Sequence, residues 1–442
     1  METFSGMKRS RGAPHVFRFL RRYLPEKAFF RKLLTLASGI LAGQLMVVAS
    51  APLLTRLFTP AEFGLFAVFS AITAITGIAI CLRLEFAVPV VGSDDEAAAL
   101  MTGAILVATI NTILVSLLVF LLGPSLVVLV DAEMLARWLW LIPLAVWIWG
   151  AGSVMNYWSL RRGRYRVNGV NRMLTLGTQA GGQVGLALAG LGSPSLILGY
   201  VLGYVVRLGH HLTHLPAFDR RLLFSLHDPR LVWRTVRSNW RYPAFIAPSS
   251  LLHNMCEMIP AIIIASMYGP AAAGWYALAQ RIMNIPTKLL GEAASEVFLG
   301  EGRTLKGHAL KQYFLRTTFF FFVLAVCGMI PVLIFAQDIF AIVFGESWRN
   351  SGLIVQLLIP LYISRFIAHP ISQLLNIMQK QYLHFIAYIF NLLSIIFIFL
   401  IAYYFDWDLK TTILVFSIFS SIAFIFSILV SWWAVHRSAL LT

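Results

Sequence analysis

The chain has 442 residues, of which 59% are hydrophobic and 12% are charged, and its formal net charge is +16. Soluble domains carry about 25% charged residues, so this composition excludes an ordinary soluble domain and indicates a membrane protein. The basic excess suggests nucleic-acid binding as an alternative, but the positive charges lie at loop ends and not on one folded face. Anionic lipid headgroups explain them better, so we expect contact with membrane lipids and no nucleic-acid partner.

The first 32 residues are strongly basic, and a long apolar run follows them. Pro14 and Pro25 interrupt this segment, which is also too long for a secretory signal. Because short cytoplasmic segments retain Lys and Arg, residues 1–32 are predicted to form a basic cytoplasmic tail.

Apolar runs that could cross the membrane as helices follow along the whole chain, each with about 20 residues or more. In the first half they lie near residues 33–55, 62–91, 97–122, 134–158, 168–190 and 194–213. In the second half they lie near residues 242–268, 271–299, 312–336, 350–376, 382–404 and 411–434. The sequence therefore predicts an all-α integral membrane protein with about 12 transmembrane helices.

The predicted spans fall into two groups that a basic segment separates. An even number of helices in each group returns the chain to the same side, so we expect two parallel six-helix bundles with both termini in the cytoplasm. The predicted parts are an N-terminal bundle (33–213), a cytoplasmic linker (214–241), a C-terminal bundle (242–434) and a cytoplasmic tail (435–442).

Two short strings recur at matched positions in the two halves. The segment PAEFGLFA at residues 60–67 reappears as PAAAGWYA at residues 270–277, and LIPL at 141–144 reappears at 358–361. Ordered pairs with similar offsets indicate two copies of one unit. This layout is typical of a transporter whose substrate site lies between two bundles.

The sequence offers no candidate for a metal or cofactor site. Cys81, Cys256 and Cys327 lie singly in apolar runs, and His210 and His211 have no acidic residue near them. A nucleotide-binding P-loop motif is also missing, so ion coupling is the expected energy source for transport. We therefore expect no cofactor and no metal.

One set of motifs resembles a known family. The run LTRLFTPAEFG at residues 54–64 precedes RLEFA at 83–87 and the acidic residues 94–96. In the second half, Glu257 precedes the apolar residues 262–264 and then Gly269, Pro270 and Gly274. This order is similar to that of the polysaccharide transporters of the MOP exporter superfamily, which share a fold with the MATE transporters.

The resemblance implies a function as well as a fold. It implies a non-enzymatic flippase that carries an undecaprenyl-diphosphate-linked O-antigen or exopolysaccharide unit from the cytoplasmic to the outer leaflet by alternating access. It further implies a bacterial cytoplasmic (inner) membrane location, and suggests a polysaccharide polymerase and a chain-length regulator as partners.

Ionisable groups within spans usually face a cavity, and such residues here could meet a diphosphate. Arginine is well suited to phosphate because its planar fork forms two parallel hydrogen bonds. The candidate substrate-binding cations are Arg83, Arg281, Lys288 and Arg365. Polar stripes that include Gln179, Gln183 and Asn284 predict a wet cleft beside them.

Each of these cations also has a structural alternative. Lys288 and Glu292 stand four residues apart and could neutralise each other, and Arg365 could cap helix carbonyls. Arg83 and Glu85 would point about 200° apart on a regular helix, so only one could face a cleft.

Carboxylates within spans are candidates for ion coupling, since burial can tune a carboxylate to exchange a proton near neutral pH. Glu257 is the first candidate because His253 precedes it by one turn. Glu292 and Glu85 are the others. The alternative for Glu257 is a simple ion pair with a cation across the bundle.

Three other functions remain open. A multidrug or cation antiporter of the same superfamily would line its cleft with carboxylates, and a sugar transporter of the major facilitator type would have a Gly-rich basic loop at residues 92–96. A membrane polysaccharide polymerase or ligase would need a nucleophile and a base, and the sequence shows no such constellation.

Overall fold

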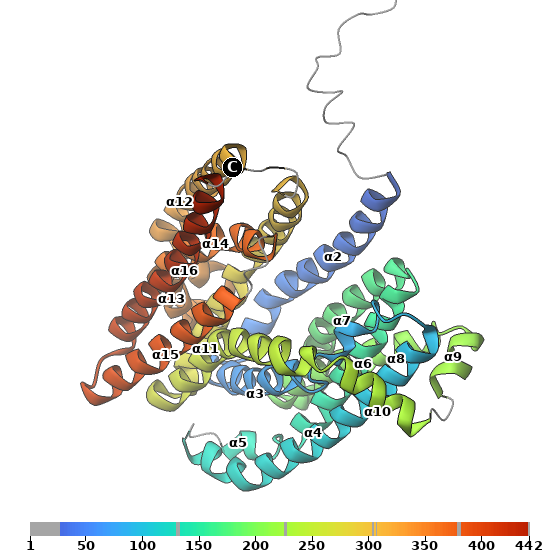
Figure 1. Cartoon of the computed structure of the whole chain (residues 1–442). Coiled ribbons are helices and arrows are strands. Elements are labelled where there is room, and N and C mark those ends of the chain that lie inside the picture. Colours follow the sequence, from blue (N-terminus) through green and yellow to red (C-terminus); the bar gives the residue numbers. More distant parts are fainter. Residues whose placement is uncertain are drawn as a thin grey trace, which may run out of the picture.

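The structure is a computed structural model, and it describes residues 27–129, 133–224, 228–302, 305, 307–377 and 382–440. The regular structure in these residues is entirely helical, as the sequence predicts (Figure 1).

The N-terminal half contains long helices joined by short ones. The long helices are α2 (Lys27–Leu57), α3 (Pro60–Ile78), α4 (Asp94–Leu129), α6 (Leu141–Arg161), α7 (Tyr165–Leu186) and α8 (Pro194–Thr213). The short ones are η1 (Leu84–Ala87), α5 (Glu133–Ala136) and η2 (Ala187–Leu191).

A connecting segment and the C-terminal half follow. The connecting helices are α9 (Ala217–Phe224), α10 (Pro229–Ser238) and η3 (Tyr242–Ile246). The helices after them are α11 (Ala247–Gly302), α12 (Gly307–Phe344), η4 (Glu346–Trp348), α13 (Arg349–Leu357), α14 (Ile359–Ile377), α15 (Tyr382–Tyr404) and α16 (Leu409–Leu440). Figure 1 shows α12 to α16 as one group and α4 to α10 as another, with α3 and part of α11 between them.

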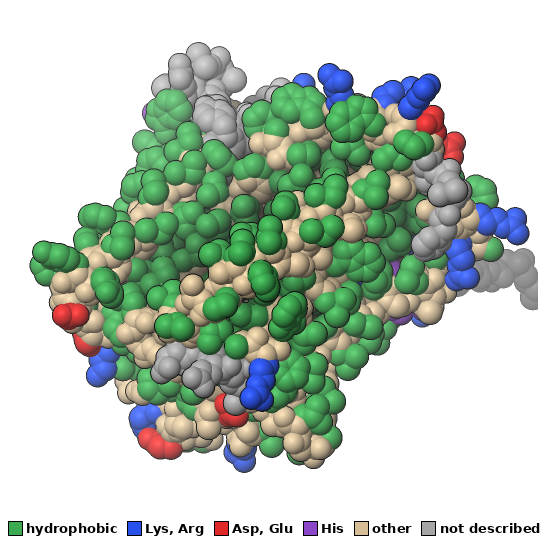
Figure 2. Space-filling view, turned by 90° about the horizontal axis from the view of Figure 1, so that it is seen from below, with side chains coloured by type: hydrophobic (Ala, Val, Ile, Leu, Met, Phe, Trp, Pro, Cys, Tyr) green, Lys and Arg blue, Asp and Glu red, His purple; other side chains and the backbone are tan. Residues whose placement is uncertain are grey.

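The helices have the length and composition of membrane spans. In the described residues, six helices are long and apolar enough to cross a membrane, and the bent pair Glu346–Leu357 and Ile359–His369 would be a seventh. Many large hydrophobic side chains on α4 and α12 point outward, among them Phe120 and Phe319. The face in Figure 2 is covered mostly by hydrophobic side chains, with most charged residues toward its margin. This surface suits a hydrocarbon solvent, whereas the count of 12 spans and their orientation stay predictions.

One predicted span is wrong in its extent. The sequence predicts a single helix over 62–91, but α3 ends at Ile78, and turns and η1 occupy much of the remainder. Leu82 and Arg83 have left-handed backbones, with φ of 49° and 59°. Residues in this conformation cannot continue a right-handed helix.

Both copies of LIPL stand where a helix begins. The first copy opens α6 at Leu141, and the second opens α14 at Ile359 after a break at Leu358. Proline suits the first turn of a helix because the amide hydrogen it lacks would have no partner there. The predicted spans 134–158 and 350–376 are therefore each divided by this repeated motif.

The copies of the longer repeat pack against each other. Gly269 interrupts α11 with a φ of 83°, so that Pro270 starts its second part. A Cβ atom on Gly64 would overlap the Pro270 carbonyl group, and one on Gly274 would overlap the Pro60 carbonyl group. We call this contact between residues 60–64 and 270–274 the glycine seam. It brings α3 and α11 to backbone contact, which only glycine permits.

The connecting segment is attached to the N-terminal half. Asp219 on α9 pairs with Arg162 at 2.8 Å and Arg164 at 2.6 Å. Val236 on α10 lies against Gly103 of α4, where a Cβ atom would overlap the valine side chain.

Candidate functional site

A cavity of about 280 Å³ lies between the two halves of the chain. Helices α2, α3, α7 and α8 line it from the N-terminal half, and α11 lines it from the C-terminal half. Its main polar side chains are Gln44, Ser70, Gln179, Gln183, Arg281 and Asn284. Its described lining residues include no Asp or Glu. Transporters built from two bundles bind substrate at this position.

Arg281 is the cation of this cavity. Its Nη2 donates to the Val47 carbonyl oxygen at 3.4 Å, and its guanidinium carbon lies 6.0 Å from the centre of the Phe63 ring. Within the described part of the chain, Arg281 takes part in none of the ion pairs. A largely desolvated cation that lies outside the described ion pairs favours an anionic ligand.

Two glutamines of α7 form the opposite wall. Gln183 Nε2 donates to the Leu196 carbonyl oxygen at 2.9 Å, and Gln179 Nε2 lies 3.4 Å from the Tyr200 carbonyl oxygen. Gly199 and Gly203 of α8 make room for these side chains, because a Cβ atom at either position would overlap a glutamine. The close packing of α7 on α8 therefore holds both amides in place.

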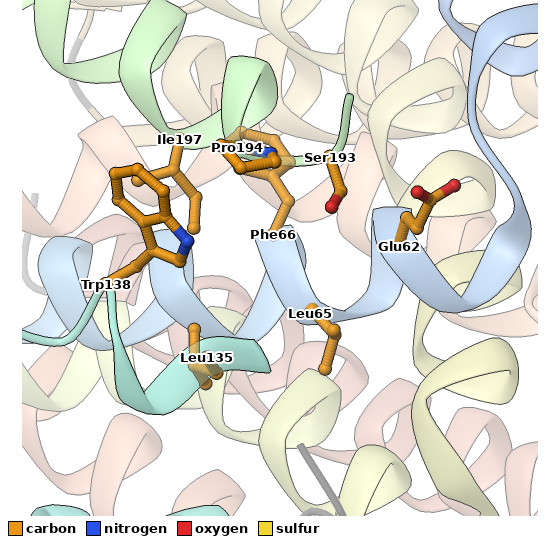
Figure 3. A pocket seen from close by; sticks show the side chains of 8 residues that line it. All are labelled: Glu62, Leu65, Phe66, Leu135, Trp138, Ser193, Pro194 and Ile197. Carbon is orange, nitrogen blue, oxygen red and sulfur yellow. The ribbon is translucent and has the colours of Figure 1, made fainter. Parts of the chain in front are cut away.

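Phe66 of α3 forms part of the wall of the cavity two residues after the glycine seam. Phe66 lines the cavity and also a separate hollow of about 10 Å³ that includes Glu62 and Trp138. Figure 3 shows the side chain of Phe66 directed toward Pro194 from α3. Its ring packs edge-on against Tyr200 with centroids 5.5 Å apart. Phe66 therefore separates the cavity from this small hollow.

Two candidate residues from the sequence pair with each other. Arg365 Nη1 lies 2.8 Å from Glu257 Oε1, so the alternative that Glu257 pairs with a cation across the bundle is observed. The Arg365 guanidinium carbon lies 5.9 Å from the centre of the Tyr362 ring. Tyr362 Oη in turn donates to Asn284 Oδ1 at 3.4 Å. This chain of contacts links the ion pair to the wall of the cavity.

His253 lies one turn before Glu257 on α11, as the sequence indicates. Its ring centre is 4.9 Å from that of Tyr388 on α15. Gln280 Nε2 donates to the Glu257 carbonyl oxygen at 2.9 Å and ties the two parts of α11 together. Glu257 and His253 thus stand in a polar region of the C-terminal half.

Arg83 and Glu85 approach each other, contrary to the expectation for a regular helix. Arg83 Nη1 lies 3.5 Å from Glu85 Oε1, and Glu85 is only 2% exposed. The left-handed turn at Leu82 and Arg83 brings the two side chains together. The Arg83 guanidinium carbon also lies 4.6 Å from the centre of the Phe86 ring. Neither charged residue lines the 280 Å³ cavity.

Lys288 and Glu292 lie on α11, but their side chains are outside the described residues. Their predicted roles in substrate binding and ion coupling stay predictions.

Three polar residues that line the cavity were not predicted from the sequence: Gln44, Ser70 and Tyr200. Gln44 and Ser70 are isolated polar residues in apolar helices and form no stripe. Gln179, Gln183 and Asn284 belong to stripes that do predict a wet cleft. Gln179 and Gln183 of α7 have the same four-residue spacing as Gly199 and Gly203 of α8. This shared spacing could have identified this wall of the cavity from the sequence.

Comparison with solved structures defines the class of fold. The lipid II flippase MurJ in an inward closed conformation matches with a TM-score of 0.70 and 12% identity, over 93% of this chain and 91% of that chain. An inward-facing multidrug MATE transporter of the MOP superfamily matches with a TM-score of 0.60 and 17% identity, over 93% and 95%. The Vibrio cholerae MATE transporter VcmN matches with a TM-score of 0.58 and 16% identity, over 93% and 96%. The fold is therefore that of the MOP-superfamily transporters.

Sequence comparison then gives the family. The profile of the polysaccharide biosynthesis protein family matches residues 53–352, and the chain belongs to this family. The lipopolysaccharide biosynthesis protein WzxC of Escherichia coli K12 is 24% identical over 183 residues, which are 40% of this chain and 36% of WzxC. The match thus spans about a third of that relative. The resemblance to the polysaccharide transporters of the MOP superfamily is confirmed.

Proposed function

We propose that the protein is a flippase that moves undecaprenyl-diphosphate-linked repeat units of O-antigen or exopolysaccharide across the bacterial cytoplasmic membrane. The observation that carries this proposal is Arg281, a cation outside the described ion pairs that lines a cavity between the two halves. Family membership and the MurJ-like fold support the same class of cargo.

The chemistry of the cavity suits a diphosphate group. A guanidinium forms two parallel hydrogen bonds with phosphate oxygens, and these bonds are stronger where water is scarce. The cavity is at the small end of ligand sites, which measure about 300–1,000 Å³, so it suits the head region of the cargo and not a whole repeat unit. Its described lining residues carry no carboxylate, which disfavours a cationic drug as the substrate.

The close contact at the glycine seam supports a direction of transport. The positive-inside pattern assigns the turn before Pro60 to the outer side of the membrane. The glycine seam at Pro60 to Gly64 would then seal the cavity from the outside, and the cargo would enter from the cytoplasmic leaflet. Separation of α3 from α11 would open the outer side, which is the alternating access expected of two bundles.

Ion coupling is the proposed energy source, and Glu257 is the proposed coupling residue. Its ion pair with Arg365 connects to the cavity through Tyr362 and Asn284. Arg365 therefore has a partner in this state, and it would reach a phosphate only after leaving Glu257. Release of Glu257 would let its carboxylate take up a proton or a sodium ion.

The test uses cells that lack the protein. Undecaprenyl-linked sugars would be extracted and analysed by mass spectrometry, and the leaflet that holds them would be determined. We expect complete diphosphate-linked units to accumulate on the cytoplasmic side. The wild-type gene should abolish this accumulation, whereas a gene for the Arg281→Ala variant should not.

A matched control replaces an arginine outside the cavity. Arg349 forms exposed ion pairs with Asp338 and Glu346, and an Arg349→Ala variant is expected to restore transport fully. Complete units already facing outward in the deletion strain would contradict flipping and favour a polymerase or ligase. No change in any such lipid would favour a multidrug antiporter.

A further inference from the structure

The cavity has two chemically different walls. On α11, Arg281 offers a positive charge, and Asn284 lies one turn beyond it. On α7, Gln179 and Gln183 offer neutral amides, and the Tyr200 phenol of α8 lies beside them. A ligand with a charged end and a neutral polar end would therefore have only one favourable orientation.

The structure determines which end of each α7 amide faces the backbone. A backbone carbonyl oxygen can only accept a hydrogen bond, so the amide group that approaches it must be the NH2 group. Gln183 makes such a bond to Leu196 at 2.9 Å, and Gln179 makes a longer one to Tyr200 at 3.4 Å. Each amide oxygen is then an acceptor, and the NH2 group of Gln183 keeps a second hydrogen, whereas the Gln179 side chain also bonds to Tyr204.

Helix packing fixes the position of the two glutamine side chains in this wall. Gln183 is only 2% exposed although it lines the cavity. Added Cβ atoms would overlap Gln183 at Gly199 and Gln179 at Gly203, so no larger residue fits there without movement. Side chains held in this way lose little further freedom when they bind a ligand, which favours specific recognition.

We infer that Gln179 and Gln183 form a sugar subsite that accepts hydrogen bonds from the hydroxyl or acetamido N–H groups of the glycan, opposite the diphosphate at Arg281. This rests on the proposed function. Amide oxygens repel phosphate oxygens, which at neutral pH act chiefly as acceptors, whereas sugar hydroxyls both donate and accept. The cargo would thus lie with its phosphates toward α11 and its sugars toward α7.

The test measures binding to the full-length protein in lipid nanodiscs with matched probes. One probe is undecaprenyl diphosphate without a sugar, and the others carry a single N-acetylhexosamine or hexose on the diphosphate. We expect a Gln179→Leu/Gln183→Leu variant to bind at least one sugar-bearing probe about tenfold more weakly, as the loss of two hydrogen bonds implies. Its affinity for the sugar-free probe should be unchanged, which would also show that the variant is folded.

Two further variants make the result specific. Arg281→Gln should weaken the binding of every probe, because all of the probes carry the diphosphate. Gln356→Leu should leave the binding of every probe unchanged, because Gln356 bonds to Gln337 and does not line the cavity.

Two results would overturn the inference, and they are distinguishable. In the first, the wild type binds the probes, but the double glutamine variant binds all of them equally more weakly or binds all of them as well as the wild type does. The sugar subsite is then wrong, and the flippase proposal stands. If the wild type binds none of the probes, both proposals fall together.

Discussion

Three arginines that the sequence assigns to apolar spans differ in their partners. Arg83 lies beside Glu85, and Arg365 pairs with Glu257, whereas Arg281 takes part in none of the ion pairs described. A paired arginine is compensated before any ligand arrives, but an unpaired one gains most from an anionic ligand. The three cations are therefore not equivalent, and Arg281 is the one that we propose for the diphosphate.

Glu257 should carry the pH dependence of transport if it is the coupling residue. A Glu257→Gln variant keeps the size of the side chain but can neither pair as an anion with Arg365 nor exchange a proton. We expect its transport rate to fall and to lose its dependence on pH, measured as export of lipid-linked units between pH 5.5 and pH 8, a range around neutrality that a tuned carboxylate would cross.

The control for this variant removes an exposed carboxylate. Glu346 pairs with Arg349 at the surface, so Glu346→Gln should leave both the rate and the pH profile unchanged. An unchanged rate and profile in Glu257→Gln would remove Glu257 from the coupling role.

At the level of elements, apolar runs long enough to cross a membrane predicted most of the long helices. Thr59 and Glu62 form a capping box at the start of α3, and proline stands in its first turn. The break after Ile78 was missed because no glycine marks the left-handed positions Leu82 and Arg83. Local sequence rarely reveals such a backbone, which the surrounding packing must hold in place.

The site was predictable only in part, for a similar reason. The positions of Arg281, Arg365 and Glu257 in apolar spans marked them as candidates for a functional role. Their partners depend on which helix faces go together, and the sequence of one helix does not contain that information. Arg281 and Arg365 therefore look alike in the sequence, although Arg281 lines the cavity and Arg365 is paired with Glu257.

The glycine seam should be the contact most sensitive to small substitutions. A methyl group at Gly64 would overlap the Pro270 carbonyl and force α3 away from α11. We expect Gly64→Ala and Gly274→Ala each to lower the melting temperature of the purified protein and to reduce transport. Backbone overlap cannot be relieved by a rotamer change, so the free energy of unfolding should fall by about 1–3 kcal/mol.

A glycine outside the seam provides the comparison. A Cβ atom at Gly181 of α7 meets no atom within 4 Å, so Gly181→Ala should be neutral or slightly stabilising in the same assays. Equal behaviour of the Gly64 and Gly181 variants would show that the seam is not closely packed in the membrane.

For the whole molecule, orientation in the membrane is the prediction on which direction of transport depends. The basic linker at 214–241 should lie in the cytoplasm, and the turn between α15 and α16 should lie outside. Single cysteines at Arg230 and Lys410, which are both exposed, would test this after replacement of the three native cysteines.

A maleimide that cannot cross membranes should label Lys410→Cys in intact spheroplasts. It should label Arg230→Cys only after the membrane is permeabilised. The opposite pattern would reverse the proposed direction of flipping, because the glycine seam would then close the cytoplasmic side.

The glycine seam has the reciprocity of an isologous dimer interface, although it lies within one chain. Gly64 meets Pro270, and Gly274 meets Pro60, so the same glycine–proline contact occurs twice about a local two-fold relation. A substitution in one copy of the repeat therefore alters its contact with the other copy, whose residues have not changed. We expect this mutual contact to preserve the likeness of the two segments while the rest of the two halves diverges.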